Sequence, residues 1–278
     1  ETQAVEPIIK SFNITEDDVK IKLLDCFAAI GGQESVDFII KLIEETDDER
    51  IIRKSLLVLG EIKADDSLEP LLEALEYENW KIRTSALKAL SNFEDELVLN
   101  TISNSLKDSN FIVREIAAEL LSEKDWKPRD EIEKTYFLIA CKNWNKLEET
   151  GFLEEVVIES LSIENTGIKK KLLQLLSTSN TDIAIKEIIK HINDTNSEIR
   201  IEVVNILGKS GSEDLLDLLI DALQDPNPKV KVSILDVLSK WDYDFVENNI
   251  IMSLDDKSLE VKLKAAAILA EKKNLVAL

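Results

Sequence analysis

The chain is poor in the residues that support most enzyme chemistry and most tight turns. Its 278 residues include one histidine, one methionine, two cysteines, seven glycines and five prolines. So few glycines and prolines argue against a turn-rich β fold. His191 has no second histidine with which to form a metal-ligand cluster. We therefore expect no metal and no cofactor, and we interpret His191 as a cation at a helix end.

Other signatures of catalysis and of membranes are missing as well. There is no glycine-rich phosphate loop, no arrangement of a nucleophile with histidine, and no calcium-loop spacing in the acidic runs. Cys26 and Cys141 lie in helical apolar patterns and are expected to be buried free thiols in a reducing compartment. No apolar run approaches about 18 residues and no signal peptide is visible. We expect a cytoplasmic protein that is not an enzyme. Because the only methionine is Met252, we also expect that the natural start is absent from this sequence.

Positive charge is scarce relative to negative charge. The chain has 34 basic and 55 acidic residues, for a net charge of −21. Residues 1–122 carry 13 of the basic and 26 of the acidic residues. Such a field repels phosphate backbones, so we expect no nucleic-acid partner. The acidic excess either keeps the protein soluble or steers a basic partner toward it.

A unit of about 31 residues repeats along the chain. In each copy two amphipathic segments flank a polar turn, and a hydrophobic residue followed by a basic residue opens the second segment. The basic positions are Lys20, Arg53, Arg83, Arg114, Lys169, Arg200, Lys231 and Lys262. This period predicts an all-α fold, an α-solenoid of about eight helix pairs, because one pair cannot cover its own apolar face.

Three stretches carry a resemblance to a known family: 68–90, 194–208 and 225–238. They resemble the HEAT-like repeat family, in the short form found in phycobilisome lyase subunits. The resemblance implies stacked helix pairs and says little about function, because these repeats serve many roles. Deoxyhypusine hydroxylase, which has such repeats, holds iron with several His–Glu pairs. Since Ile192 follows the single histidine, that activity is excluded.

The basic residues raise a specific question, because Arg200 falls inside the apolar arc of its helix, and an unpaired buried charge is very costly. Either Thr195 or Asn196 can cap that helix. Six residues before the basic position, five copies have an aspartate: Asp47, Asp108, Asp194, Asp225 and Asp256. The other three copies have Ile14, Tyr77 and Ile163, so we expect a missing ion pair at Arg83.

The resemblance implies a structural ladder of these aspartates with the basic side chains of the same or the next repeat. Its expected cations are Arg53, Arg83, Arg114, Arg200, Lys231 and Lys262. The alternative is a row of cations that binds phosphate or carboxylate groups.

Residues 123–150 interrupt the period. One amphipathic helix is predicted over 131–144, flanked by Trp126 and Trp144. Together with Pro128, Tyr136 and Ala140, these residues resemble a linking module of some HEAT-like proteins. We therefore predict N-terminal repeats over 1–122, a linking module over 123–150 and C-terminal repeats over 151–278. The module is either a packed wedge or a bend that receives a ligand.

Two surface features are candidates for partner binding. Trp80 and Phe111 lie 31 residues apart in the first turns of their helices and form either a binding hot spot or a cover for the turn. Ile201, Val232 and Leu263 form an apolar stripe that either receives a partner or packs between repeats. The sequence leaves open whether another segment or chain covers the last repeat, which ends in LVAL (275–278).

The function we predict is a non-catalytic scaffold that binds a protein partner on the concave face formed by the second helices. Neither the partner nor the oligomeric state can be identified from the sequence. The alternative, which only the resemblance suggests, is a bilin lyase or a bilin-transfer chaperone subunit acting on phycobiliproteins. A third class, nucleic-acid binding as in some HEAT-like DNA glycosylases, would need a basic concave face that the sequence lacks.

Overall fold

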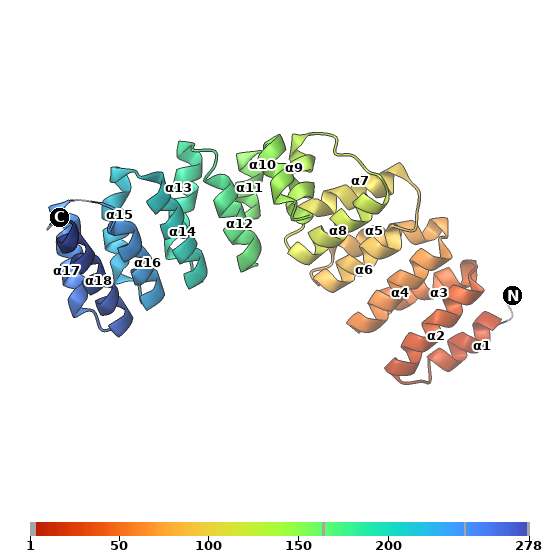
Figure 1. Ribbon diagram of the computed structural model, residues 1–278. Coiled ribbons are helices and arrows are strands. Elements are labelled where there is room, and N and C mark those ends of the chain that lie inside the picture. Colours follow the sequence, from red (N-terminus) through yellow and green to blue (C-terminus); the bar gives the residue numbers. More distant parts are fainter. Residues whose placement is uncertain (1–3, 163–164, 242, 277–278) are drawn as a thin grey trace. The chain divides into compact units, whose positions relative to one another are not determined.

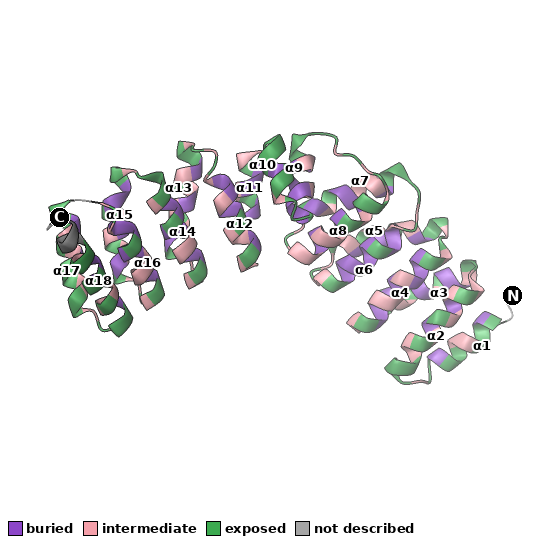
Figure 2. Cartoon of the chain, viewed as in Figure 1, coloured by how far each residue is buried: buried purple, intermediate pink, exposed green. Residues whose placement is uncertain are grey.

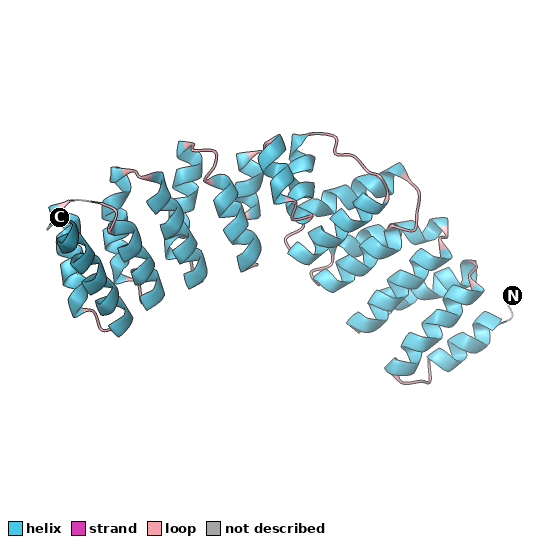
Figure 3. Ribbon diagram, viewed as in Figure 1, coloured by secondary structure: helices cyan, strands magenta, loops and turns pink. Residues whose placement is uncertain are grey.

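The computed structural model describes residues 4–162, 165–241 and 243–276 and is all-α within these ranges, as predicted (Figures 1 and 3). Its 18 α-helices form eight pairs of a first and a second helix, with one further short pair. Ile163 and the end of the LVAL sequence, 277–278, lie outside the described residues. In the described part, no helix combines the length and the apolar character needed to cross a membrane.

The chain divides into two compact units, residues 1–149 and 150–278. The first helices of the N-terminal unit are α1 (Val5–Phe12), α3 (Gln33–Glu45), α5 (Leu68–Glu73) and α7 (Glu96–Asn104). The second helices are α2 (Asp17–Ile30), α4 (Glu49–Ile62), α6 (Trp80–Leu90) and α8 (Phe111–Glu123). The short pair α9 (Glu131–Ala140) and α10 (Trp144–Thr150) follows.

The C-terminal unit repeats this order. Its first helices are α11 (Glu154–Ser160), α13 (Asp182–Lys190), α15 (Leu216–Asp221) and α17 (Asp244–Met252). Its second helices are α12 (Thr166–Leu176), α14 (Ser197–Ser210), α16 (Pro228–Leu238) and α18 (Leu259–Val276). In both units a single turn of 3-10 helix extends several first helices to the inter-helix turn: Ala74–Glu76, Ser105–Lys107, His191–Asn193, Ala222–Gln224 and Ser253–Asp255.

The interruption differs from the single helix predicted over 131–144. Helix α9 ends at Ala140, and Lys142 adopts a positive φ of 56° before α10 begins. Trp126 and Trp144 are both half-buried, and the Trp126 ring lies 5.4 Å from that of Phe137. The interruption is thus a reduced helix pair rather than one helix.

The second helices of each unit pack on one another more extensively than the first helices do (Figure 1). Small residues cause this close approach. A Cβ added to Gly60 would lie 2.6 Å from the Ala89 Cα, and one added to Gly208 would lie 2.5 Å from a Val237 methyl carbon. The buried residues lie on the helix faces that pack against neighbouring helices (Figure 2). Since the second helices approach so closely, the first helices are left further apart and grooves open between them.

Candidate functional site

Four ion pairs join neighbouring repeats at the inter-helix turns. In each, the cation of one second helix reaches the aspartate that lies 25 residues further along the chain. The pairs are Arg83–Asp108 (2.7 Å), Lys169–Asp194 (2.5 Å), Arg200–Asp225 (2.6 Å) and Lys231–Asp256 (2.6 Å). The cation therefore forms its ion pair with the aspartate of the next repeat and not with the aspartate of its own turn.

Arg200 shows how fully these groups are used. Its Nε and Nη2 donate to the two carboxylate oxygens of Asp225 at 2.6 and 2.8 Å. Its Nη1 donates to the carbonyl oxygens of Asp194 and Thr195 at 2.8 and 3.3 Å. The guanidinium thus ties its own turn to the next one and is only 9% exposed, which leaves little of it to bind an external anion.

Each ladder aspartate also organises the start of its helix. Asp225 accepts the amide N–H of Asn227 at 2.7 Å, and the Asn227 side chain accepts the amide N–H of Lys229 at 2.9 Å. Burial alone would raise the pKa of Asp225, but the hydrogen bonds from Arg200 and the Asn227 amide outweigh it and lower that pKa. The Asp256 pKa is also lowered, chiefly by the hydrogen bond from Lys231.

The structure does not bring Asp47 and Arg53 together. In that repeat, the Thr46 hydroxyl accepts the Asp48 amide N–H at 3.2 Å, and Asp48 caps α4. Arg53 then lies one residue beyond the ladder position and pairs with Glu49 at 3.3 Å. The caps of α4, α6 and α8 are Asp48, Asn79 and Asn110, each 31 residues from the next, and counted from the cap the ladder position of α4 is Ile52.

The missing ion pair lies at Ile52 and not at Arg83, so the sequence-based expectation for Arg83 was wrong. Arg83 donates to the carbonyl oxygens of Tyr77 and Glu78 and still pairs with Asp108. Ile52 is buried, and the position 25 residues beyond it is Tyr77. Uncharged residues therefore occupy both positions of this ion pair. The spacing between helix caps in the sequence could have revealed this change.

The last cation of each unit has no ladder partner among the described residues. Arg114 donates to the Asp108 carbonyl at 2.7 Å, but 25 residues beyond it lies the buried Ile139 of α9. Its Nη2 has no hydrogen-bond partner in the described part of the chain, and burial lowers its pKa. Lys262 likewise forms none of the ion pairs found between described residues. The ladder is therefore interrupted at the short pair α9–α10.

The candidate partner-binding residues differ in exposure. Trp80 and Phe111 are half-buried at the first residues of α6 and α8. Ile201 and Val232 are half-buried too, whereas Leu263 is 62% exposed. The stripe is thus partly covered within the stack and open on α18.

Exposed polar side chains of the second helices also pair across repeats. Each link joins positions 28 or 29 residues apart: Asp25–Lys54, Gln174–Glu202, Asn205–Ser233 and Asp236–Lys264. Two of these links, Asp25–Lys54 and Asp236–Lys264, are ion pairs that pair opposite charges across repeats, although such exposed pairs stabilise the fold little.

A groove between α3 and α5 differs in charge from the exposed face of the second helices. Six carboxylates line it: Asp37, Glu44, Asp65, Asp66, Glu69 and Glu73. Its apolar residues are Ile40, Ile43, Pro70 and Tyr77, and its volume is about 530 Å³. We call it the acidic groove.

The histidine and the cysteines differ from their predicted states. Burial, assisted by the charge of Lys169, lowers the His191 pKa and so disfavours the charged form that was expected at this helix end. Both cysteines are free, but Cys26 is half-buried and Cys141 is exposed, so the prediction of buried thiols was wrong. In the described part of the chain, no group of three or more metal-ligating side chains converges.

Comparison with known proteins matches the chain to the model of HEAT repeats over residues 36–122 and 154–239. No match was found among the curated proteins.

Solved structures similar to the chain include human deoxyhypusine hydroxylase in complex with glycerol (16% identity, 98% of this chain and 96% of that chain, TM-score 0.38). The complex of CpcE and CpcF of phycocyanin lyase from Nostoc sp. is 12% identical, and the match covers 96% of this chain and 94% of that chain, with a TM-score of 0.35. Microtubule polymerases with tumor overexpressed gene domain arrays are also 12% identical (99% and 78%, TM-score 0.36).

Proposed function

Because the chain belongs to the family of HEAT-repeat proteins, we propose that it is a non-catalytic scaffold that binds a protein partner. Stacked repeats present extended surfaces that partners use. The alternative of a bilin lyase stays untested, and no contact described above favours it.

The observation that carries the proposal is the set of exposed leucines on the α17–α18 pair, which we call the α18 face and define by Leu254, Leu259 and Leu263. These side chains are 36%, 69% and 62% exposed. At the position of Leu254, the two preceding repeats have Leu223 and Ile192, both buried. Much of the α17–α18 pair is exposed in Figure 2. Leu259 and Leu263 lie one helical turn apart on α18, and exposed apolar side chains on one face of a helix mark interaction surfaces.

The charge beside this face fits the same role. Lys262 occupies the ladder position, and its counterparts Arg200 and Lys231 each bind an aspartate of the following repeat. A partner that presents an apolar surface with a carboxylate would bury the leucines and pair with Lys262. The contact would then have the composition of the interfaces inside the stack.

The test compares the wild-type chain with the double variant Leu259→Glu/Leu263→Glu. The matched control is Leu97→Glu/Ile183→Glu, which changes two apolar side chains that are also exposed but lie apart on α7 and α13. A partner captured from extracts of the native organism is purified, and its affinity for all three proteins is measured by calorimetry. We expect at least a tenfold loss for the α18-face variant only.

Two results would contradict the proposal. One is a partner that binds the α18-face variant as tightly as the control. The other is sedimentation data that show the wild type as a dimer and the α18-face variant as a monomer, because a second copy would then cover the face. Thermal unfolding of each variant verifies that it is folded.

A further inference from the structure

We propose that the acidic groove between α3 and α5 binds a lysine- or arginine-rich segment of a protein partner, with Tyr77 as its apolar anchor. The inference rests on the proposed scaffold function, but it concerns a different surface from the α18 face.

The charges of the groove are not paired with cations in the described part of the chain. None of its six carboxylates forms an ion pair with a described lysine, arginine or histidine, although such pairs link the exposed second-helix side chains. The polar neighbour that two of them share is Gln33, whose Nε2 donates to Asp37 at 2.8 Å and to Asp66 at 2.7 Å. A neutral amide bridges these two carboxylates without neutralising them. The groove therefore offers its negative charge to a cationic ligand.

The apolar floor of the groove indicates a ligand that has apolar groups as well as positive charge. Ile40 and Pro70 are half-buried, Ile43 is 8% exposed, and Tyr77 is half-buried beside them. The described side chains contain no convergent carboxylate set that would hold a metal ion. A ligand that uses both parts needs cationic groups for the rim and apolar groups for the floor, and a basic peptide segment has both.

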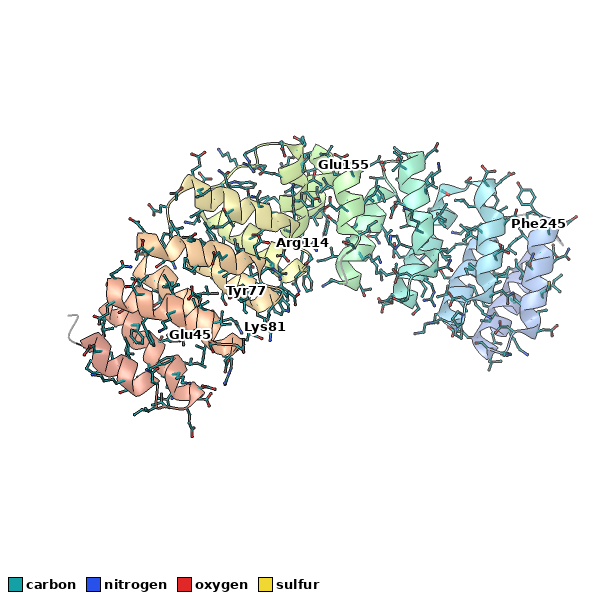
Figure 4. All side chains as sticks on the ribbon, turned by 180° about the vertical axis from the view of Figure 1, so that it is seen from behind. Glu45, Tyr77, Lys81, Arg114, Glu155 and Phe245 are labelled. Atoms are coloured by element: carbon teal, nitrogen blue, oxygen red, sulfur yellow. The ribbon has the colours of Figure 1, made fainter. Side chains whose placement is uncertain are left out.

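Tyr77 is a departure from the repeat at this place. Its position has an aspartate in the repeats of Asp108, Asp194 and Asp225, where the carboxylate closes an ion pair. Here the cation is replaced by Ile52, so Tyr77 has no ladder charge to bind. Tyr77 instead lines both the acidic groove and a second cavity of about 600 Å³, which Asn104 and Lys107 also line. Tyr77 is labelled in Figure 4, and tyrosine is enriched among residues that dominate binding energy.

The uniformly acidic lining of this groove is not repeated in the corresponding groove of the C-terminal unit. The corresponding cavity between α15 and α17 is lined by Lys231 together with Asp221 and Asp256, so it carries both signs of charge. The acidic groove has only one sign. A second copy of this chain, with a net charge of −21, is a poor occupant.

The experiment measures the binding of a fluorescein-labelled 12-residue peptide of alternating lysine and leucine to the full chain by anisotropy at about 0.15 M salt. Two further peptides have glutamate in place of lysine, or serine in place of leucine. The groove variant is Asp66→Asn/Glu69→Gln/Glu73→Gln, and Tyr77→Ala tests the anchor. The control variant, Asp214→Asn/Asp217→Asn/Asp221→Asn, removes the same charge from exposed positions around α15.

We expect at least a tenfold weaker Kd for the groove variant and for Tyr77→Ala, and less than a twofold change for the control variant. The glutamate peptide is expected not to bind, and the serine peptide to bind at least tenfold more weakly. Equal losses in the groove and control variants would overturn the proposal, because attraction would then come from net charge alone. A serine peptide that binds like the leucine peptide, or a leucine peptide that does not bind, would overturn it too.

The two proposals fail independently. The variant Leu259→Glu/Leu263→Glu is expected to bind the lysine–leucine peptide like the wild type, because its changes lie in the other compact unit. If the groove variants contradict the groove proposal, the proposal for the α18 face is unaffected. If a partner is lost only in the α18-face variant, that result does not support the groove proposal.

Discussion

Arg200 on α14 binds Asp225 through both carboxylate oxygens, across 25 residues of sequence. The aspartate belongs to the turn of the next repeat, so the contact fixes one helix pair against its neighbour. Its side chain also accepts the amide N–H of Asn227, two residues further on. Stacking between repeats and the start of each second helix are therefore coupled through one carboxylate.

Removing that carboxylate is expected to destabilise the C-terminal unit. In Asp225→Ala the guanidinium of Arg200 stays in place without its counter-ion, and a largely buried charge without a partner costs about 3 kcal/mol. Urea unfolding followed by circular dichroism measures the loss. Arg50→Ala is the control, since Arg50 is exposed and binds exposed or half-exposed aspartates, and its expected effect is within about 0.5 kcal/mol.

The double variant Arg200→Met/Asp225→Leu separates charge from packing. Because both charges are removed, it is expected to recover much of the stability that Asp225→Ala loses. If Asp225→Ala unfolds at the same urea concentration as the wild type, the ion pair is not structural, and the cations regain their interpretation as an anion-binding row.

Stability is also expected to fall in acid. The pKa values of Asp194, Asp225 and Asp256 are lowered in the folded state. A carboxyl whose pKa is lower when folded stabilises the fold above its unfolded pKa, about 3.9, and loses this contribution as pH falls through its folded pKa. Urea unfolding at pH 5, 4 and 3 is expected to show falling stability, with a shallower fall for Asp225→Asn. Equal slopes in the two proteins would contradict this origin.

The sequence predicted the fold well because its period is carried by many residues at once. Apolar spacing, polar turns and the charged pair all recur together, so the all-α stack did not depend on any single position. What the sequence could not predict was whether each cation forms its ion pair within its own repeat or with the next repeat. Arg83 was expected to lack a partner because its own turn has Tyr77, yet its partner is Asp108 of the next repeat.

The candidate surfaces were harder to predict for a related reason. Ile201, Val232 and Leu263 are equivalent in sequence, but Ile201 and Val232 are half-buried whereas Leu263 is exposed. The acidic groove was missed because its residues come from α3, from α5 and from the turns on either side of α5, which the sequence separates from α3 by the whole of α4.

Restoring the ladder at Ile52 and Tyr77 tests the register inferred from the caps. Ile52→Arg alone places a charge at a position that is 5% exposed, and Tyr77→Asp alone places a carboxylate opposite an isoleucine. Each single variant is expected to lose stability. In the double variant the two charges lie 25 residues apart, as in the other ion pairs, so a favourable coupling of about 1 kcal/mol is expected from the double-mutant cycle. Strictly additive losses would show that the ladder position is assigned wrongly.

The close approach of the second helices gives the last prediction. Gly60 of α4 faces Ala89 of α6, and an added Cβ would lie 2.6 Å from the Ala89 Cα, which is backbone and cannot turn aside. The helices must separate to accept Gly60→Ala, at an expected cost of about 1–3 kcal/mol in urea unfolding, even though alanine favours helix formation. Gly167→Ala is the control, because its Cβ would meet only the Asn165 side-chain oxygen, at 3.3 Å. Equal stabilities for the two variants would show that Gly60 does not set the distance between these helices, and the same result would remove the physical reason for the groove that opens between α3 and α5.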